Sequence, residues 1–133
     1  MKNHIAIFND KEVIEKIFCC RKTVESRFSQ KRIAPYKKVM KDDVIYLKLS
    51  GGEILGKVIV DNALYFDNLN KKKIREICAN YETELAMDKN FWHNKTSAKF
   101  GSLIFLKSPN RFLTPLRFNK RDRRGWVVLE NDL

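Results

Sequence analysis

The sequence has little of several residue types that mark particular classes of protein. Its 133 residues include three prolines, five glycines and three cysteines, which excludes collagen-like and low-complexity chains. No apolar run approaches the ~18 residues that a membrane-spanning helix needs, and the apolar stretch at 4–8 is too short for a secretory signal peptide. The cysteines form no C-x-x-C pair, which gives no indication of a zinc site or a redox pair. Without a signal peptide, we expect reduced thiols in a cytoplasmic protein. No cofactor and no membrane partner are expected.

Positive charge is what the sequence has in excess. Lys and Arg number 27 against 16 Asp and Glu, a formal net charge of +11. Two segments, 21–41 and 111–124, are densely basic. This balance predicts an anionic partner, with nucleic acid and RNA in particular favoured. The alternative is a basic surface that only keeps the protein in solution. The hydrophobic content of 44% predicts a packed core, and we expect one domain over 1–133.

Hydrophobic periodicity predicts an α+β fold. We expect a helix from Asn9 to Cys20, a second helix from Asn70 to Leu85 and a helical turn at 88–94. Strands are predicted at 4–8, 23–28, 44–49, 54–66 and 102–106, with closing strands at Phe112 and 126–129. The segment 54–66 is predicted to be either one strand or two strands joined by a kink at 61–62. Residues 29–42 are predicted to form a loop. The order of these elements favours a small curved sheet or β-barrel with flanking helices.

A polar motif follows the first predicted helix. It reads Lys22-x-x-Glu25-x-Arg27 at the start of a strand. Because a strand has a period of two, Glu25 and Arg27 lie on one face, with Lys22 just before them. The motif therefore indicates either a charged cluster at a pocket or an ordinary surface ion pair. Two cations beside Glu25 lower its pKa, which suits it better to orienting Arg27 than to acting as a base.

The motif resembles the characteristic segment of the ASCH family, within the PUA-like superfamily of small β-barrels. In that family a helix ends in Gly-x-Lys-x-x-Glu-x-Arg, and the matching residues are Lys22, Glu25 and Arg27. The family's glycines before the motif and before the next strand are replaced here by Cys20 and Asp42. The resemblance covers nearly the whole chain. It implies a PUA-like barrel with a cleft between barrel and helix, lined by the motif.

The resemblance also implies two classes of function. The superfamily is associated with RNA binding, and some relatives bind modified bases. Some small ASCH members resemble amidohydrolases of acylated cytidine, in which the motif lysine is catalytic and a threonine is the nucleophile. Here the threonine position is Glu25. If the protein is an enzyme, Lys22 and Glu25 are the predicted catalytic residues.

Further candidate ligand-binding residues lie outside the motif. Of the adjacent Phe91 and Trp92, only one can face the core, which leaves the other as a stacking platform for a base, and Trp92 is chosen for that role. The Ser50-Gly51 turn offers backbone N–H groups to an anion, although a plain hairpin turn is the simpler interpretation. Basic residues expected to contact phosphate complete the set: Arg21, Arg32, Arg121, Arg123 and Arg124. The two histidines are too far apart in sequence to indicate a metal site.

Three functions follow from these observations. The first is a module that binds RNA, a nucleotide or a modified base in a basic cleft around the motif. The second is a hydrolase of a modified nucleoside. The third is an adaptor for a small molecule or a protein, for which the basic surface serves solubility alone.

Overall fold

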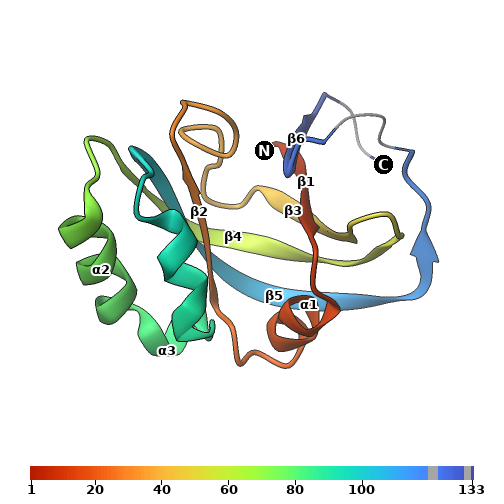
Figure 1. Ribbon diagram of the computed structural model, residues 1–133. Helices are drawn as coiled ribbons and strands as arrows, with labels where there is room; N and C mark the ends of the chain where they lie inside the picture. Colours follow the sequence, from red (N-terminus) through yellow and green to blue (C-terminus); the bar gives the residue numbers. More distant parts are fainter. Residues whose placement is uncertain (120–122, 131–132) are drawn as a thin grey trace.

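The centre of the computed structural model, which describes residues 1–119, 123–130 and 133, is one mixed sheet. Its six strands lie in the order β2-β5-β4-β3-β1-β6, and the sheet curls into a half-barrel (Figure 1). The strands are β1 (Asn3–Phe8), β2 (Val24–Ser29), β3 (Val44–Leu49), β4 (Ile54–Phe66), β5 (Phe100–Leu116) and β6 (Trp126–Leu129). Only β1 and β3 pair in parallel among these strands. The predicted α+β class and curved sheet are confirmed.

The two longest strands differ from the prediction in informative ways. β4 is a single strand whose pairing with β5 shifts register between Val60 and Asn62, so the predicted kink at 61–62 is a bulge rather than a break. Phe112 was predicted to lie in a separate closing strand, which is wrong. It lies within β5, because that strand is 17 residues long and continues beyond the apolar segment at 102–106. The predicted closing strand at 126–129 is confirmed as β6.

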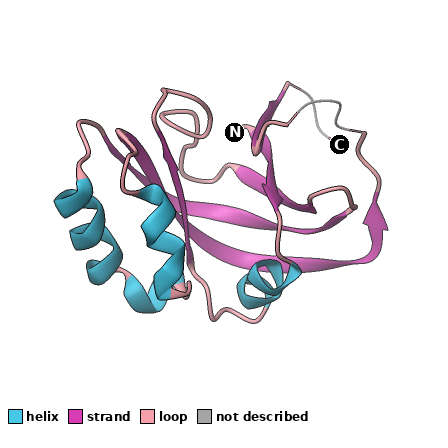
Figure 2. Cartoon of the chain, in the orientation of Figure 1, coloured by secondary structure: helices cyan, strands magenta, loops and turns pink. Residues whose placement is uncertain are grey.

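The helices lie at the margins of the sheet (Figure 2). They are α1 (Lys11–Phe18), α2 (Lys71–Asn80), α3 (Glu82–Leu85) and the 3-10 helix η1 (Lys89–Lys95). The first helix begins after Asp10, not at Asn9, because the Asp10 carboxylate accepts the Glu12 N–H at 2.9 Å. Asn70 caps α2 as predicted, but the expected helix to Leu85 is interrupted at Tyr81, whose φ of −120° is not helical.

Apolar side chains of the helices and strands pack into core clusters against the curled sheet. One cluster packs α1, through Ile14 and Ile17, against β1, β3 and β4. A second packs α2 and α3 against β2 and β5, and in Figure 1 these two helices lie together at one end of the sheet, apart from α1. No helix in the described ranges is long and apolar enough to span a membrane. The helices α2 and α3 therefore support β2 and β5, and α1 supports the other part of the sheet.

Candidate functional site

A tight turn after α1 positions the motif. Cys20 has a φ of 65°, and its N–H donates to the Ile17 carbonyl while the Arg21 N–H donates to that of Lys16. These are the two hydrogen bonds of a Schellman motif, in which the left-handed residue is usually glycine. Cys20, which stands where the resemblance leads one to expect glycine, thus occupies a left-handed position. Cys19, the C-cap residue of α1, is exposed.

The motif residues form a continuous chain of charges. The Lys22 ammonium nitrogen lies 3.3 Å from one oxygen of Glu25, and the Arg27 Nε donates to the other oxygen at 2.8 Å. Lys22 also donates to the Leu85 carbonyl at 2.8 Å, at the end of α3. The side chains of Lys22, Glu25 and Arg27 are 0%, 10% and 22% exposed. The predicted alternative of an ordinary surface ion pair therefore does not describe this cluster.

Burial and charge act in opposite directions on the central carboxylate. Burial alone raises the pKa of Glu25, but the charges of Lys22 and Arg27 and their hydrogen bonds outweigh it and lower that pKa below its ordinary value. Burial lowers the pKa of Lys22, and Glu25 offsets part of this effect. Glu25 is thus held as a carboxylate, which makes it a good hydrogen-bond acceptor and a poor base.

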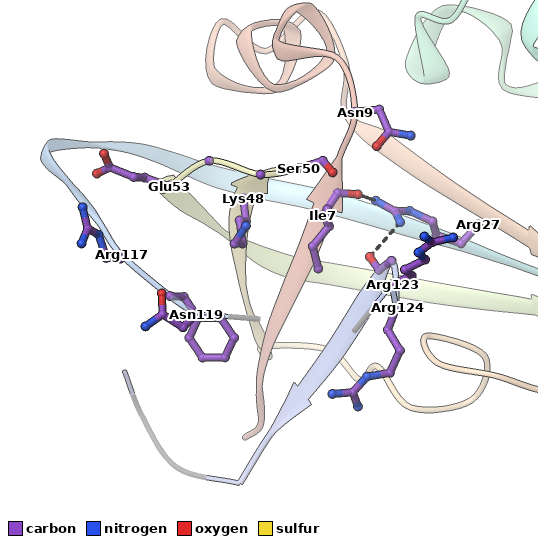
Figure 3. Close-up of a pocket in the computed structure, with 14 residues that line it drawn as sticks. Ile7, Asn9, Arg27, Lys48, Ser50, Glu53, Arg117, Asn119, Arg123 and Arg124 are labelled. Carbon is purple, nitrogen blue, oxygen red and sulfur yellow. Dashed lines mark hydrogen bonds between the residues drawn. The ribbon is translucent and has the colours of Figure 1, made fainter. Parts of the chain in front are cut away.

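Arg27 closes the half-barrel. Its guanidinium donates to the Ile7 carbonyl in β1 and to the Gly125 carbonyl just before β6, each at 3.0 Å, as Figure 3 shows. The rings of Phe8 and Trp126 lie 5.0 and 5.4 Å from its central carbon. β2 and β6 are the two edges of the sheet, so this one side chain joins β2 to the opposite edge. Most of its donors are therefore used in the fold.

A cavity of about 500 Å³ lies over the motif and is called the motif cavity below. Glu25 and Arg27 of the motif line it, together with the charged residues Asp10 and Lys95, and Lys22 does not. Its other walls come from α1, from the loop between β2 and β3, and from the segment around η1, and its aromatic lining residues are Phe8, Phe28, Tyr36, Phe91, Phe100 and Trp126. Glu25 and Arg27 of the motif thus line a cavity beside α1, whereas Lys22, which the resemblance also places in the cleft, does not.

The aromatic pair at 91–92 is arranged opposite to the prediction. Phe91 lines the motif cavity, whereas Trp92 packs on the second core cluster, with its ring 6.2 Å from that of Phe28. Trp92, the predicted stacking platform, therefore does not line the motif cavity, and Phe91 is the member of the pair that does. Arg32 lies over the Phe100 ring at 5.2 Å, which places it beside the cavity. Arg21 is exposed and lines neither this cavity nor the next.

A second cavity of about 900 Å³ adjoins the first (Figure 3). We call it the basic cavity, because five of its lining residues are cationic and one is acidic. The cations are Arg27, Lys48, Arg117, Arg123 and Arg124, and the acid is Glu53. Ser50 and Gly51 also line it, so the structure brings together two predicted groups, the turn and the C-terminal arginines. Arg121 lies outside the described residues. Ile7, Asn9, Arg27 and Gly125 line both cavities.

A buried polar network near the motif was not predicted from the sequence. His4 Nε2 lies 2.8 Å from the Asp43 carboxylate, and the Trp126 indole donates to His4 Nδ1 at 3.1 Å. Nδ1 is therefore an acceptor, and the neutral ring donates through Nε2. A histidine and an aspartate 39 residues apart gave no signal in sequence spacing. No group of His, Cys, Asp or Glu within the described ranges is arranged to hold a metal ion.

The fold is similar to that of solved ASCH structures. ASCH from Zymomonas mobilis aligns with a TM-score of 0.74 at 12% identity, over 97% of this chain and 88% of that one. A tyrosine-to-phenylalanine variant of the same protein aligns at 0.75 and 13%, over 98% and 91%, and a serine-to-alanine variant at 0.74 and 14%, over 97% and 89%. No protein-family model and no curated protein matches the chain. The predicted resemblance is confirmed for the fold, which is that of the ASCH structures.

Proposed function

We propose that the protein binds RNA and holds one unpaired base in the motif cavity. The observation that carries the proposal is a carboxylate set in an aromatic cavity on a protein with a net charge of +11. Bases splayed out of single-stranded RNA are recognised by stacking on aromatic side chains and by hydrogen bonds to their edges. The motif cavity offers both kinds of contact, and the basic residues outside it supply contacts to phosphate.

Glu25 favours a base that carries an amino group. Each of its oxygens accepts one contact from the motif, and a carboxylate has about four acceptor positions. The remaining positions suit the amino group of a base such as cytosine, which is a donor. Phe91, half-buried beside the cavity, is the stacking platform. The three free cysteines support a reducing, cytoplasmic setting for this binding.

Hydrolysis of a modified cytidine receives less support from the geometry. Lys22 is buried behind Glu25 and does not line the cavity, and the pKa of Glu25 is lowered. The structure therefore favours binding over catalysis, and turnover of an acylated cytidine stays a prediction. Incubation of the protein with such a nucleoside tests it directly.

A stacking variant tests the proposed base site. Phe91→Ala removes the platform, and we expect single-stranded RNA to bind about tenfold more weakly, because one stacked base contributes ~1–3 kcal/mol. Fluorescence anisotropy with a labelled oligonucleotide measures the change. Phe112→Ala is the matched control, since Phe112 is a half-buried phenylalanine that lines neither cavity. Equal affinities of the two variants would contradict the proposal.

A further inference from the structure

Lys48 is the least expected residue of the basic cavity. In β3 it alternates with Val44 and Tyr46 on one face, and in the parallel register of β1 it lies opposite Ile7. These neighbours are apolar, and Lys48 is only 5% exposed. Strand alternation has thus placed a lysine within an apolar surface, where a leucine or valine is the usual occupant.

The ammonium of Lys48 has no carboxylate partner. Its one hydrogen bond within the described ranges goes to the Leu49 carbonyl at 3.2 Å, and no acidic oxygen there lies within 4.0 Å of its nitrogen. Lys22, buried to a similar degree, has Glu25 as its partner. Buried charges in proteins are normally paired, because an isolated one is costly. The missing partner of Lys48 therefore points to an anion that enters the basic cavity.

Neighbouring groups add donors suited to an anion with several oxygens. In the turn after β3, the N–H groups of Ser50 and Gly52 are used in hydrogen bonds to Phe8 and Leu49. The Gly51 N–H has no partner among the described residues, and the Ser50 side chain is exposed. Arg117 and Arg123 are exposed, and Figure 3 shows them on opposite sides of Lys48 in that view.

We propose that the basic cavity is a phosphate-binding site in which Lys48 is the central ligand. Phosphate offers several oxygens to an ammonium, a hydroxyl, a backbone N–H and guanidinium groups, and arginine can bind it through two donors. The phosphate belongs either to an RNA backbone or to a free phosphorylated molecule. Arg27 separates this site from the motif cavity, so the proposal does not depend on base binding there.

Thermal unfolding with inorganic pyrophosphate as the probe tests the site. We expect pyrophosphate to raise the melting temperature of the wild type, because a ligand that binds only the folded state stabilises it. Lys48→Met keeps the volume and removes the charge, and we expect its affinity to fall about 10- to 100-fold, as for the loss of hydrogen bonds to a charged group. Without pyrophosphate this variant is expected to melt at a higher temperature than the wild type, since the unpaired buried charge is gone.

The matched control separates a site from general attraction to a basic protein. Lys57→Met removes the same charge from the neighbouring strand β4, and Lys57 lines neither cavity. It should respond to pyrophosphate like the wild type. Arg117→Gln together with Arg123→Gln is a second test variant, independent of the core, and should also weaken binding. The proposal is overturned by an equal response of all variants or by no response of the wild type.

Labelled RNA distinguishes the two sources of phosphate. If the RNA backbone occupies the site, pyrophosphate competes with the oligonucleotide and Lys48→Met binds RNA more weakly. If the ligand is a free phosphorylated molecule, RNA binding is unchanged in Lys48→Met while pyrophosphate binding is lost. Both outcomes support the phosphate site. The Phe91→Ala experiment reports on the base cavity alone, so failure of one proposal is distinguishable from failure of the other.

Discussion

Glu25 is the residue on which the motif depends. It is the only carboxylate within 4.0 Å of the Lys22 ammonium in the described part of the chain, and it also holds the Nε of Arg27. Because Lys22 is 1% exposed, water cannot replace the carboxylate. The pair therefore contributes more to specifying the local structure than an ion pair at the surface does.

Removal of the Glu25 charge is expected to destabilise the protein strongly. Glu25→Gln leaves Lys22 as an uncompensated buried charge, which costs about 3–5 kcal/mol of unfolding free energy. Urea denaturation measures the loss. Glu15→Gln, which breaks the exposed ion pair with Arg111, is the control and should have a small effect. Equal losses of unfolding free energy in the two variants would show that the buried ion pair contributes no more to stability than the exposed one.

The left-handed turn after α1 predicts a stabilising substitution. Cys20→Gly is expected to add about 0.5–1 kcal/mol to the unfolding free energy, because relief of the positive φ exceeds the entropy that glycine loses on folding. Cys19→Gly is the matched control. This cysteine is also exposed, but its φ of −88° suits any residue, so glycine there should destabilise the protein. A loss of stability in Cys20→Gly would contradict the argument.

The buried His4 network predicts a stability that falls with acid. Burial lowers the pKa of His4 below its ordinary value of 6.5, although Asp43 opposes the effect. The unfolded chain therefore binds a proton more readily than the folded one, and stability present above pH 6.5 is lost as the pH falls through the lower folded value. Urea unfolding at pH 7, 6 and 5 should show this decline.

A non-titrating variant isolates the contribution of His4 to that decline. In His4→Gln the amide can donate to Asp43 and accept from the Trp126 indole, so the hydrogen bonds of the wild type are kept. The slope between pH 7 and pH 5 should be smaller than in the wild type. Identical slopes would assign the decline to other groups.

Local patterns in the sequence identified the motif residues but not their surroundings. The spacing of Glu25 and Arg27 was sufficient, because neighbours two apart on a strand share a face. Lys48 was missed, since a lysine in an alternating strand normally marks the exposed face. Tyr36 and Phe100 were missed as walls of the motif cavity because they reach it only through contacts between distant segments.

At the scale of the elements, one tyrosine holds the long loop between β2 and β3. The Tyr65 hydroxyl, on β4, accepts the Val39 N–H at 2.9 Å and donates to the Val39 carbonyl at 2.6 Å. The same loop contributes Pro35 and Tyr36 to the motif cavity. The shape of the cavity therefore depends on a contact outside it.

Loss of that hydroxyl should weaken both stability and binding. Tyr65→Phe leaves two loop groups unpaired, at a cost of about 1–3 kcal/mol in unfolding free energy, and frees one wall of the cavity. Denaturation and RNA anisotropy measure the two effects. Tyr46→Phe is the control, because the Tyr46 hydroxyl has no partner in the described ranges, and it should behave like the wild type. If both variants match the wild type, Tyr65 does not anchor the loop.

Strands and helices with a strong hydrophobic pattern were predicted correctly, but some of their ends were predicted less closely. The strands β3 and β4 agree with the predicted ranges because alternation and the intervening turn define them. The start of α1 was assigned to Asn9, since both Asn9 and Asp10 are good caps and only the contacts select the second. The interruption at Tyr81, whose ring contacts that of Phe105, was not visible in the helical period.

At the scale of the whole molecule, charge should govern affinity for RNA. The net charge of +11 predicts that the logarithm of the association constant falls linearly with the logarithm of the salt concentration. The expected slope is about −0.7 for each phosphate contacted on a single strand. For four contacts, a fourfold rise in salt weakens binding about 50-fold. Anisotropy titrations from low to physiological salt measure the slope. Binding that is absent at low salt, or insensitive to salt, would contradict a nucleic-acid partner.

The closure of the half-barrel by Arg27 also determines how the molecule can open. Neighbouring strands of the sheet are joined by ladders of main-chain bonds, whereas β2 meets the opposite edge through two donors of one guanidinium. Parting this seam breaks two hydrogen bonds and leaves every ladder intact. The seam also forms the wall between the two cavities. Since Ile7, Arg27 and Gly125 line both cavities, opening of this seam would connect the aromatic cavity with the arginines of the basic cavity.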